Sequence, residues 1–179
     1  MARNRTLSLI LPAFGAAIIA ALAQIVIPIG AVPITLQTFA VGLVAAILKP
    51  REATLAATLY LILGAIGLPV FAGGGGGLQA FFGPSAGYLL AYPFFALVTS
   101  VLTHANTPIW KNFWAFVLGD SLVFVGGILS LHFLGKMGWS AAVAVGLTPF
   151  IIPDLLKGLI VALVTKPILK ALKNHSYFN

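Results

Sequence analysis

The stretch Trp114–Leu131, WAFVLGDSLVFVGGILSL, decides the fold class of this chain. Its one charged residue is Asp120, and apart from two serines its other members are apolar or small. An α-helix rises about 1.5 Å per residue, so about 20 such residues cross the ~30 Å of hydrocarbon in a bilayer. A transmembrane β-strand would instead show short segments of alternating polarity. The stretch therefore predicts a membrane-spanning helix.

The composition of the whole chain extends this prediction. Hydrophobic residues make up 60% of the 179 residues, and charged residues only 7%, with ten Lys or Arg against three Asp or Glu. A soluble domain has roughly a quarter charged residues, because its surface faces water. We therefore predict an integral membrane protein. A soluble enzyme, a disordered chain and a nucleic-acid-binding module are excluded, and the absence of Cys excludes disulfides and thiolate metal sites.

Proline, glycine and charged residues divide the apolar sequence into six predicted helices. Proline cannot continue a helix, because it has no amide hydrogen to donate and collides with the preceding turn. Six spans would use roughly 120 residues, so we expect residues 1–179 to form a single transmembrane domain. Segments 67–83 and 135–152 are predicted connections, the second with room for a short interfacial helix. The predicted helices are Leu7–Ile27, Leu36–Leu48, Glu52–Ile66, Ser85–Thr103, Trp110–Leu134 and Pro153–Leu172.

The basic residues predict how these helices are oriented. An even number of spans places both ends of the chain on one side of the membrane, and cytoplasmic loops are rich in Lys and Arg. Lys136 is the one basic residue predicted on the opposite side, and Lys157 lies within the last helix. We therefore expect both termini in the cytoplasm, on the side that carries Arg3, Arg5, Lys49, Arg51, Lys111, Lys166, Lys170 and Lys173.

The first predicted helix has two further features. Arginines precede its apolar run, as in a secretory signal, but the run continues past Ala23, so we predict a helix that is retained. Small residues spaced four apart let membrane helices approach each other closely. We interpret them either as packing within the chain or as a contact with a partner. They form two series, Ala13 with Ala17 and Ala21, and Ala16 with Ala20.

Asp154 and Lys157 are the charged pair most typical of a binding site. Their i, i+3 spacing puts them on one face of the last predicted helix. Ionisable residues within a span are costly to bury and mark functional sites. A carboxylate accepts hydrogen bonds and an ammonium donates them, which suits a ligand with a cyclic amide or urea and an acid group. The alternative is a structural ion pair that anchors the loop, with Lys157 reaching to the membrane interface.

Asp120 and the glycine run 73–77 each leave two interpretations open. Asp120 could bind a proton or a cation, or it could accept a hydrogen bond from a neighbouring helix. Glycine allows positive φ angles, so the run could form a lid or backbone clamp over a small ligand, or a flexible connection. It is not a phosphate-binding loop, because no Lys-Ser or Lys-Thr follows it. We predict neither a metal site nor an enzyme, since no catalytic set is recognisable and the histidines are scattered at His104, His132 and His175.

Several motifs, in their order and spacing, resemble the BioY family. They are VPITLQT at 32–38, LGAIGLPVF at 63–71 with the glycine run after it, FGPSAGYL at 82–89 and PDLLK at 153–157. The resemblance covers nearly the whole chain. BioY proteins are the biotin-specific substrate-binding subunits, or S components, of energy-coupling factor (ECF) transporters. The resemblance implies the all-α S-component fold with six transmembrane helices and an outward biotin pocket, in a bacterial cytoplasmic membrane.

The resemblance also implies which residues bind the substrate. Asp154 resembles the acid that binds the ureido ring of biotin, and Lys157 is its polar neighbour and the nearest cation for the biotin carboxylate. Some members have Asn in the glycine run and Arg after the tyrosine, where this chain has Gly75 and Leu89. Backbone groups or Gln79 would then hold the ureido ring. The implied substrate-binding residues are Asp154, Lys157, Gln37, Gly75, Gln79 and Tyr88, with biotin as the ligand and no cofactor.

Members of this family work with partner subunits. The resemblance implies a membrane coupling subunit and two cytoplasmic ATPase subunits, and the absence of a Walker motif here agrees with ATP hydrolysis in trans. The small-residue face of the first helix contacts the coupling subunit in the family, which favours Ala13, Ala17 and Ala21, or Ala16 and Ala20 in the other register. The alternative function is a stand-alone, ion-coupled secondary transporter of a vitamin-like solute.

Overall fold

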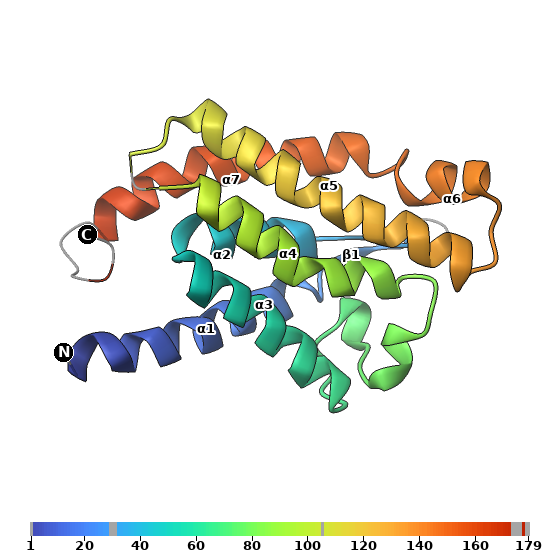
Figure 1. The fold of residues 1–179 in the computed structure, drawn as a ribbon, viewed down its shortest axis with the longest axis horizontal. Helices are drawn as coiled ribbons and strands as arrows, with labels where there is room; N and C mark the ends of the chain where they lie inside the picture. The colour runs from blue at the N-terminus through green and yellow to red at the C-terminus, as the bar shows by residue number, and fades with distance from the viewer. Residues whose placement is uncertain (1, 29–31, 105, 173–176, 178–179) are drawn as a thin grey trace.

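The computed structural model describes residues 2–28, 32–104, 106–172 and 177, and these form an all-α bundle (Figure 1). A single two-stranded antiparallel ribbon accompanies the helices in this part of the chain. The elements are α1 (Ala2–Leu22), β1 (Val26–Ile27), β2 (Ile34–Thr35), α2 (Gln37–Ile47), α3 (Pro50–Ala65), α4 (Ala86–Leu102), α5 (Ile109–Phe133), α6 (Trp139–Gly146) and α7 (Ile151–Leu172), with 3₁₀ turns η1 (Ala72–Gly74) and η2 (Leu78–Phe81).

The first predicted helix, Leu7–Ile27, is wrong at both ends, and α1 begins earlier, at Ala2. α1 ends at Leu22 rather than Ile27, because Val26 and Ile27 pair with Thr35 and Ile34 in the ribbon. β-Branched residues favour such extended pairing. Hydropathy does not distinguish them from a continuation of the helix, because they are as apolar as the residues before them. The other predicted helices begin and end within two residues of α2, α3, α4, α5 and α7, and the short helix expected in segment 135–152 is α6.

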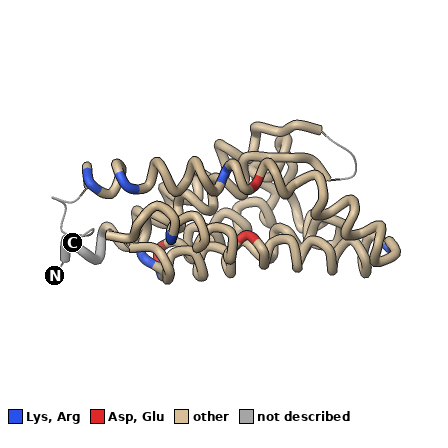
Figure 2. Tube along the Cα trace, turned by 90° about the horizontal axis from the view of Figure 1, so that it is seen from above, with Lys and Arg blue, Asp and Glu red and all other residues tan. Residues whose placement is uncertain are grey.

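The helices run roughly along the long axis of the molecule (Figure 1). The first turn of α1 and the last turn of α7 lie at the same end, called here the terminal end. The opposite end, the loop end, holds the α3–α4 connection and α6. Figure 2 shows that basic residues gather toward the terminal end. Apart from Lys157, which lies inside α7 at the cavity described below, and Lys136, which follows α5 at the loop end, the described ones are in α1, the α2–α3 turn and the terminal-end turns of α5 and α7. Lys173 and His175 lie outside the described residues.

The surface of the bundle resembles one that faces lipid. Large apolar side chains such as Phe94, Trp114 and Ile152 are exposed on α4, α5 and α7,. Within the described ranges, α5 is by itself long and apolar enough to cross a bilayer, and α6 with α7 passes the same test as a pair bent by 43°. Three other helices are apolar but shorter: the Leu7–Leu22 part of α1, α2 and α4.

The helix α2 forms the centre of the bundle. Its 11 residues span only about 17 Å, roughly half the hydrocarbon thickness,. Most of them are buried against α1, α3, α4 and α7. Small side chains permit this packing: a Cβ added at Gly42 would lie less than 3.0 Å from the Phe116 ring of α5. Because α2 begins inside the bundle, its first turn faces the cavity described below.

A polar contact closes the terminal end. The Tyr177 hydroxyl donates to Glu52 Oε2 at 3.2 Å and accepts from the Lys49 backbone N–H at 3.1 Å. Burial raises the pKa of Tyr177 to about 12. Tyr177, which lies beyond the end of α7 in the sequence, is thereby tied to the α2–α3 turn. Glu52 is a buried acid at the start of α3, at the end of the bundle away from the loops.

Candidate functional site

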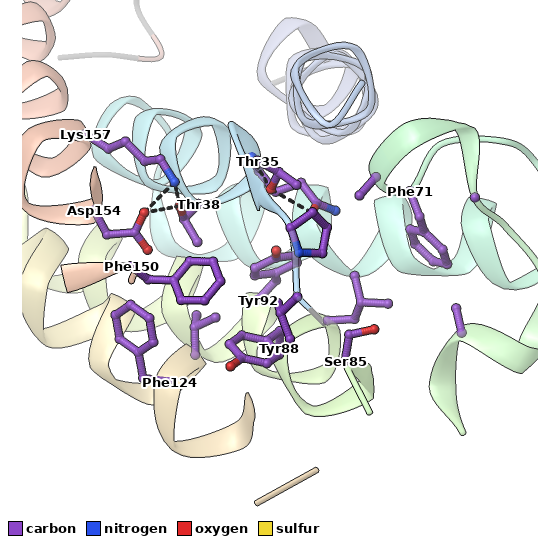
Figure 3. Close-up of a pocket in the computed structure, with 18 of the residues that line it drawn as sticks. Thr35, Thr38, Phe71, Ser85, Tyr88, Tyr92, Phe124, Phe150, Asp154 and Lys157 are labelled. Carbon is purple, nitrogen blue, oxygen red and sulfur yellow. Dashed lines mark hydrogen bonds and ion pairs between the residues drawn. The ribbon is translucent and has the colours of Figure 1, made fainter. Parts of the chain in front are cut away.

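A cavity of about 420 Å³ lies among α2, α4, α5 and α7 on the side of the loop end (Figure 3). Residues of segment 67–83, called here the covering loop, form one of its walls. This volume lies within the range of small-molecule pockets. The structure brings all six predicted substrate-binding residues to its lining: Asp154, Lys157, Gln37, Gly75, Gln79 and Tyr88.

A triangle of polar side chains holds the charges at this cavity (Figure 3). Lys157 Nζ forms an ion pair with Asp154 Oδ1 and donates to Thr38 Oγ1 at 3.0 Å. The Thr38 hydroxyl donates to Asp154 Oδ1 at 3.2 Å. Asp154 is 3% exposed and Lys157 7%, so the idea that Lys157 reaches to the interface is wrong. A buried charge pair persists when further hydrogen bonds satisfy both groups, as Thr38 does here.

Two helix N-termini position this triangle. Thr38 lies in the first turn of α2, and Asp154 in the first turn of α7, where Pro153 is tolerated because the first turn needs no donor,. The positive ends of both helix dipoles favour a carboxylate at this place. Thr38 was not predicted as a site residue, because a single threonine in an apolar helix gives no spacing signal.

Thr35 and Gln37 form a second polar part of the lining, and the buried Tyr60 of α3 holds Gln37 in place from behind. Gln37 Nε2 donates to the Tyr60 hydroxyl at 2.5 Å, and Thr35 Oγ1 donates to Gln37 Oε1 at 3.0 Å. Both ends of the Gln37 amide are therefore occupied within the chain. The pairing fixes the start of α2 against α3, so Gln37 shapes the cavity in addition to lining it.

Aromatic side chains form the apolar walls of the cavity, and two of their rings pack directly against glycine residues. The Tyr88 hydroxyl donates to the Gly146 carbonyl at 2.7 Å. A Cβ at Gly127 would lie less than 3.0 Å from the Tyr88 ring, and one at Gly64 would lie equally close to the Phe71 ring. These rings therefore rest on bare backbone. Three further aromatic residues line the cavity but give no signal in the sequence: Tyr92, Phe124 and Phe150.

The covering loop is tied to α1 and to itself. The Gln24 side-chain amide, just beyond α1, donates toward the carbonyls of Val70 and Phe71, each at 3.3 Å. Within the loop, Gln79 Nε2 donates to Gly76 O at 2.6 Å. Positive φ angles occur in the glycine run, as predicted, at Gly73, Gly74 and Gly77. These contacts fix the loop to the end of α1, which argues against a loose connection.

The remaining predicted residues do not line this cavity. On α1, Ala13, Ala17 and Ala21 are exposed, whereas Ala16 is completely buried in the core and Ala20 is partly buried against it. The second alanine series therefore packs within the chain. Asp120 is buried in α5 and does not line the cavity. Within the described ranges, no three His, Cys, Asp or Glu side chains cluster as a metal site would require.

An apolar exposed surface and a cavity of small-molecule size beside a buried ion pair are typical of a membrane protein with a small-solute site,. The BioY family profile matches residues 1–174. The chain is 43% identical to biotin transporter BioY2 of Lactococcus lactis subsp. cremoris, covering 99% of both, and 38% identical to biotin transporter BioY of Thermotoga maritima, covering 79% and 83%. It superposes on a crystal structure of the S-component for biotin from an ECF-type ABC transporter with a TM-score of 0.86, at 28% identity over 100% and 99% of the two chains. The chain belongs to the BioY family, as the resemblance of its motifs predicted.

Proposed function

We propose that this chain is the biotin-binding S component of an ECF transporter and takes up biotin together with an ATP-driven module. The observation that carries the proposal is the Asp154–Lys157–Thr38 triangle, buried in the wall of an otherwise largely apolar cavity. Full-length similarity to named biotin transporters and to a biotin S-component supports it. The chain is then a transporter subunit rather than an enzyme.

The chemistry of the triangle suits a cyclic urea. An ammonium has three donors, and Lys157 uses one on Asp154 and one on Thr38, which leaves one for the ureido carbonyl,. The second oxygen of Asp154 points away from Lys157 in Figure 3 and would accept a ureido N–H. The apolar sulfur-containing ring of biotin and its aliphatic chain would pack on Tyr88 and Phe150, and its carboxylate would lie toward the amides of the covering loop.

The direct test is binding of labelled biotin to the purified chain. We expect saturable binding that unlabelled biotin and analogues with an intact ureido ring displace, and that simple alkanoic acids do not. Absence of saturable binding would contradict the proposal. Biotin uptake into liposomes driven by a proton gradient, with no ATPase present, would instead support a stand-alone secondary transporter.

We further propose that the terminal end is cytoplasmic and that α1–α5 and α7 are the six membrane segments. The basic residues at the terminal end support this orientation,. The short helix α6 would lie at the outer interface, where Trp139 stacks on His132 at a ring distance of 3.9 Å. The expected location is a bacterial cytoplasmic membrane, crossed several times, in a complex with a coupling subunit and two ATPase subunits.

The exposed alanines of α1 suggest where the coupling subunit docks. Ala13, Ala17 and Ala21 form a smooth face that a partner helix can approach closely,. Replacing Ala17 with Trp is expected to reduce co-purification with the coupling subunit by about tenfold or more, since a loss of ~1.4 kcal/mol suffices. Biotin binding by the isolated chain should persist, because Ala17 is outside the cavity. Ala144→Trp, at an exposed alanine of α6, is the matched control, and equal co-purification of both variants would refute this interface.

A further inference from the structure

A second cavity, of about 150 Å³, lies between α5 and α7 beside the first. Asp120 and Asp154 both line it, and except for Ser121 its other walls are apolar. Asp154 lines both cavities. The acid of the substrate site therefore has a second buried acid as its neighbour, from the helix that faces it.

Two carboxyl groups but only one described basic side chain line these two cavities. Asp120 is 4% exposed, and its Oδ1 has no hydrogen-bond partner among the described residues. Of the described Lys and Arg residues, Lys157 alone lines either cavity, and it is paired with Asp154. The titratable groups that α4 turns toward these acids are the phenols of Tyr88 and Tyr92, which bring no positive charge. α2 contributes the uncharged Thr38, and α6 contributes no titratable side chain to either lining.

We propose that Asp120 and Asp154 hold one proton between them, and that it resides on Asp120 while Asp154 stays ionised beside Lys157. A second ionised carboxylate here would be an unpaired charge in a medium of low dielectric, which is strongly disfavoured. One proton removes that charge, so the group of Asp120, Asp154 and Lys157 becomes neutral as a whole.

A metal ion fits this cavity less well than a proton. Hard cations take about six or more oxygen ligands. Among the described residues, only Asp120, Asp154 and Ser121 bring side-chain oxygens to the second cavity. The Ser121 hydroxyl already donates to the Leu118 carbonyl at 2.7 Å. A proton needs only one carboxylate oxygen, which Asp120 provides.

Infrared spectroscopy of the full-length chain tests the shared proton. At neutral pH, wild type is expected to show the carbonyl stretch of a protonated carboxylic acid, which Asp120→Asn removes and Ser121→Ala retains. Asp154→Asn should also remove the band, because the remaining Asp120 would then ionise and pair with Lys157. Absence of the band in wild type would overturn the proposal. Its persistence in Asp154→Asn would show that Asp120 is protonated independently of Asp154, which also overturns it.

A second consequence rests on the proposed function, because it concerns biotin. Loss of the proton gives the site a net negative charge, which repels the biotin carboxylate. On the alkaline side of the pH at which the infrared band disappears, biotin affinity is expected to fall by up to about tenfold per pH unit. Biotin methyl ester, which has no carboxylate, should show no such fall, and neither should Asp120→Asn.

The two readouts separate failure of the inference from failure of the proposed function. A decline of the same size in wild type and Asp120→Asn would overturn the link between the proton and the ligand, with Ser121→Ala expected to follow wild type. Failure of wild type to bind biotin at any pH would refute the proposed function, and the infrared bands would still decide whether the proton is shared.

Discussion

Replacing Asp154 with Asn is expected to weaken biotin binding roughly 30- to 700-fold while the protein still folds. Asn keeps the size of the side chain but removes the negative charge that pairs with Lys157. It also replaces the carboxylate whose second oxygen would accept the ureido N–H. Loss of one partner of a buried, hydrogen-bonded charge pair costs about 2–4 kcal/mol in binding, and each ~1.4 kcal/mol is tenfold in affinity. Calorimetric titration of the purified variant measures the change directly.

The control for this variant is Glu52→Gln. It makes the same chemical change at another buried acid, but at the terminal end beside Tyr177 and far from the cavity. Its biotin affinity should match wild type. An unchanged affinity in Asp154→Asn would refute the site assignment. If the loss were confined to free biotin and absent for biotin methyl ester, the triangle would hold the carboxylate rather than the ureido ring.

Replacing Gly127 with Ala is the second variant with a large expected effect. The added methyl group would lie less than 3.0 Å from the Tyr88 ring, so the ring must move into the cavity and its bond to the Gly146 carbonyl must change. Overpacking of this kind costs about 1–3 kcal/mol, which corresponds to a roughly 5- to 150-fold loss of biotin affinity if the cost falls on the pocket. Alanine favours helix over glycine, so a loss cannot come from α5 itself.

Gly138→Ala is the matched control for the packing effect. Gly138 precedes α6 with a φ of −61°, and a Cβ there meets nothing within 4 Å. Titration of both variants with biotin, together with their thermal unfolding, separates loss of the pocket from loss of stability. Equal affinities in the two glycine variants would show that packing of the Tyr88 ring against Gly127 does not shape the binding site.

Much of the fold could be predicted from the sequence because its helices end at residues with a clear physical effect. Lys49-Pro50 separates α2 from α3, and the glycine-rich segment separates α3 from α4. The six candidate site residues could be predicted partly from charge within a span, as for Asp154 and Lys157. The others depended on the family resemblance, since Gln79 or Tyr88 alone gives no chemical signal.

The remaining features depend on tertiary contacts that no local pattern encodes. The end of α1 is set by pairing between Val26–Ile27 and Ile34–Thr35, and an apolar β-branched strand has the same hydropathy as a helix. Thr38 belongs to the site because α2 packs against α7, which brings its hydroxyl to Asp154 and Lys157. The choice between the two alanine series depended on which face of α1 packs inward, and the pattern of small residues is the same on both.

The short helix α2 has a consequence for the route of the solute. After its first turn, α2 fills the middle of the bundle with buried residues such as Ala40, Val41, Val44 and Ala45. It therefore acts as a plug between the cavity and the terminal end. A bound solute cannot pass through this packed arrangement as it would pass through a channel. Delivery to the terminal side requires helices to separate or the whole chain to change its position in the bilayer, and a partner subunit could supply the work for either movement.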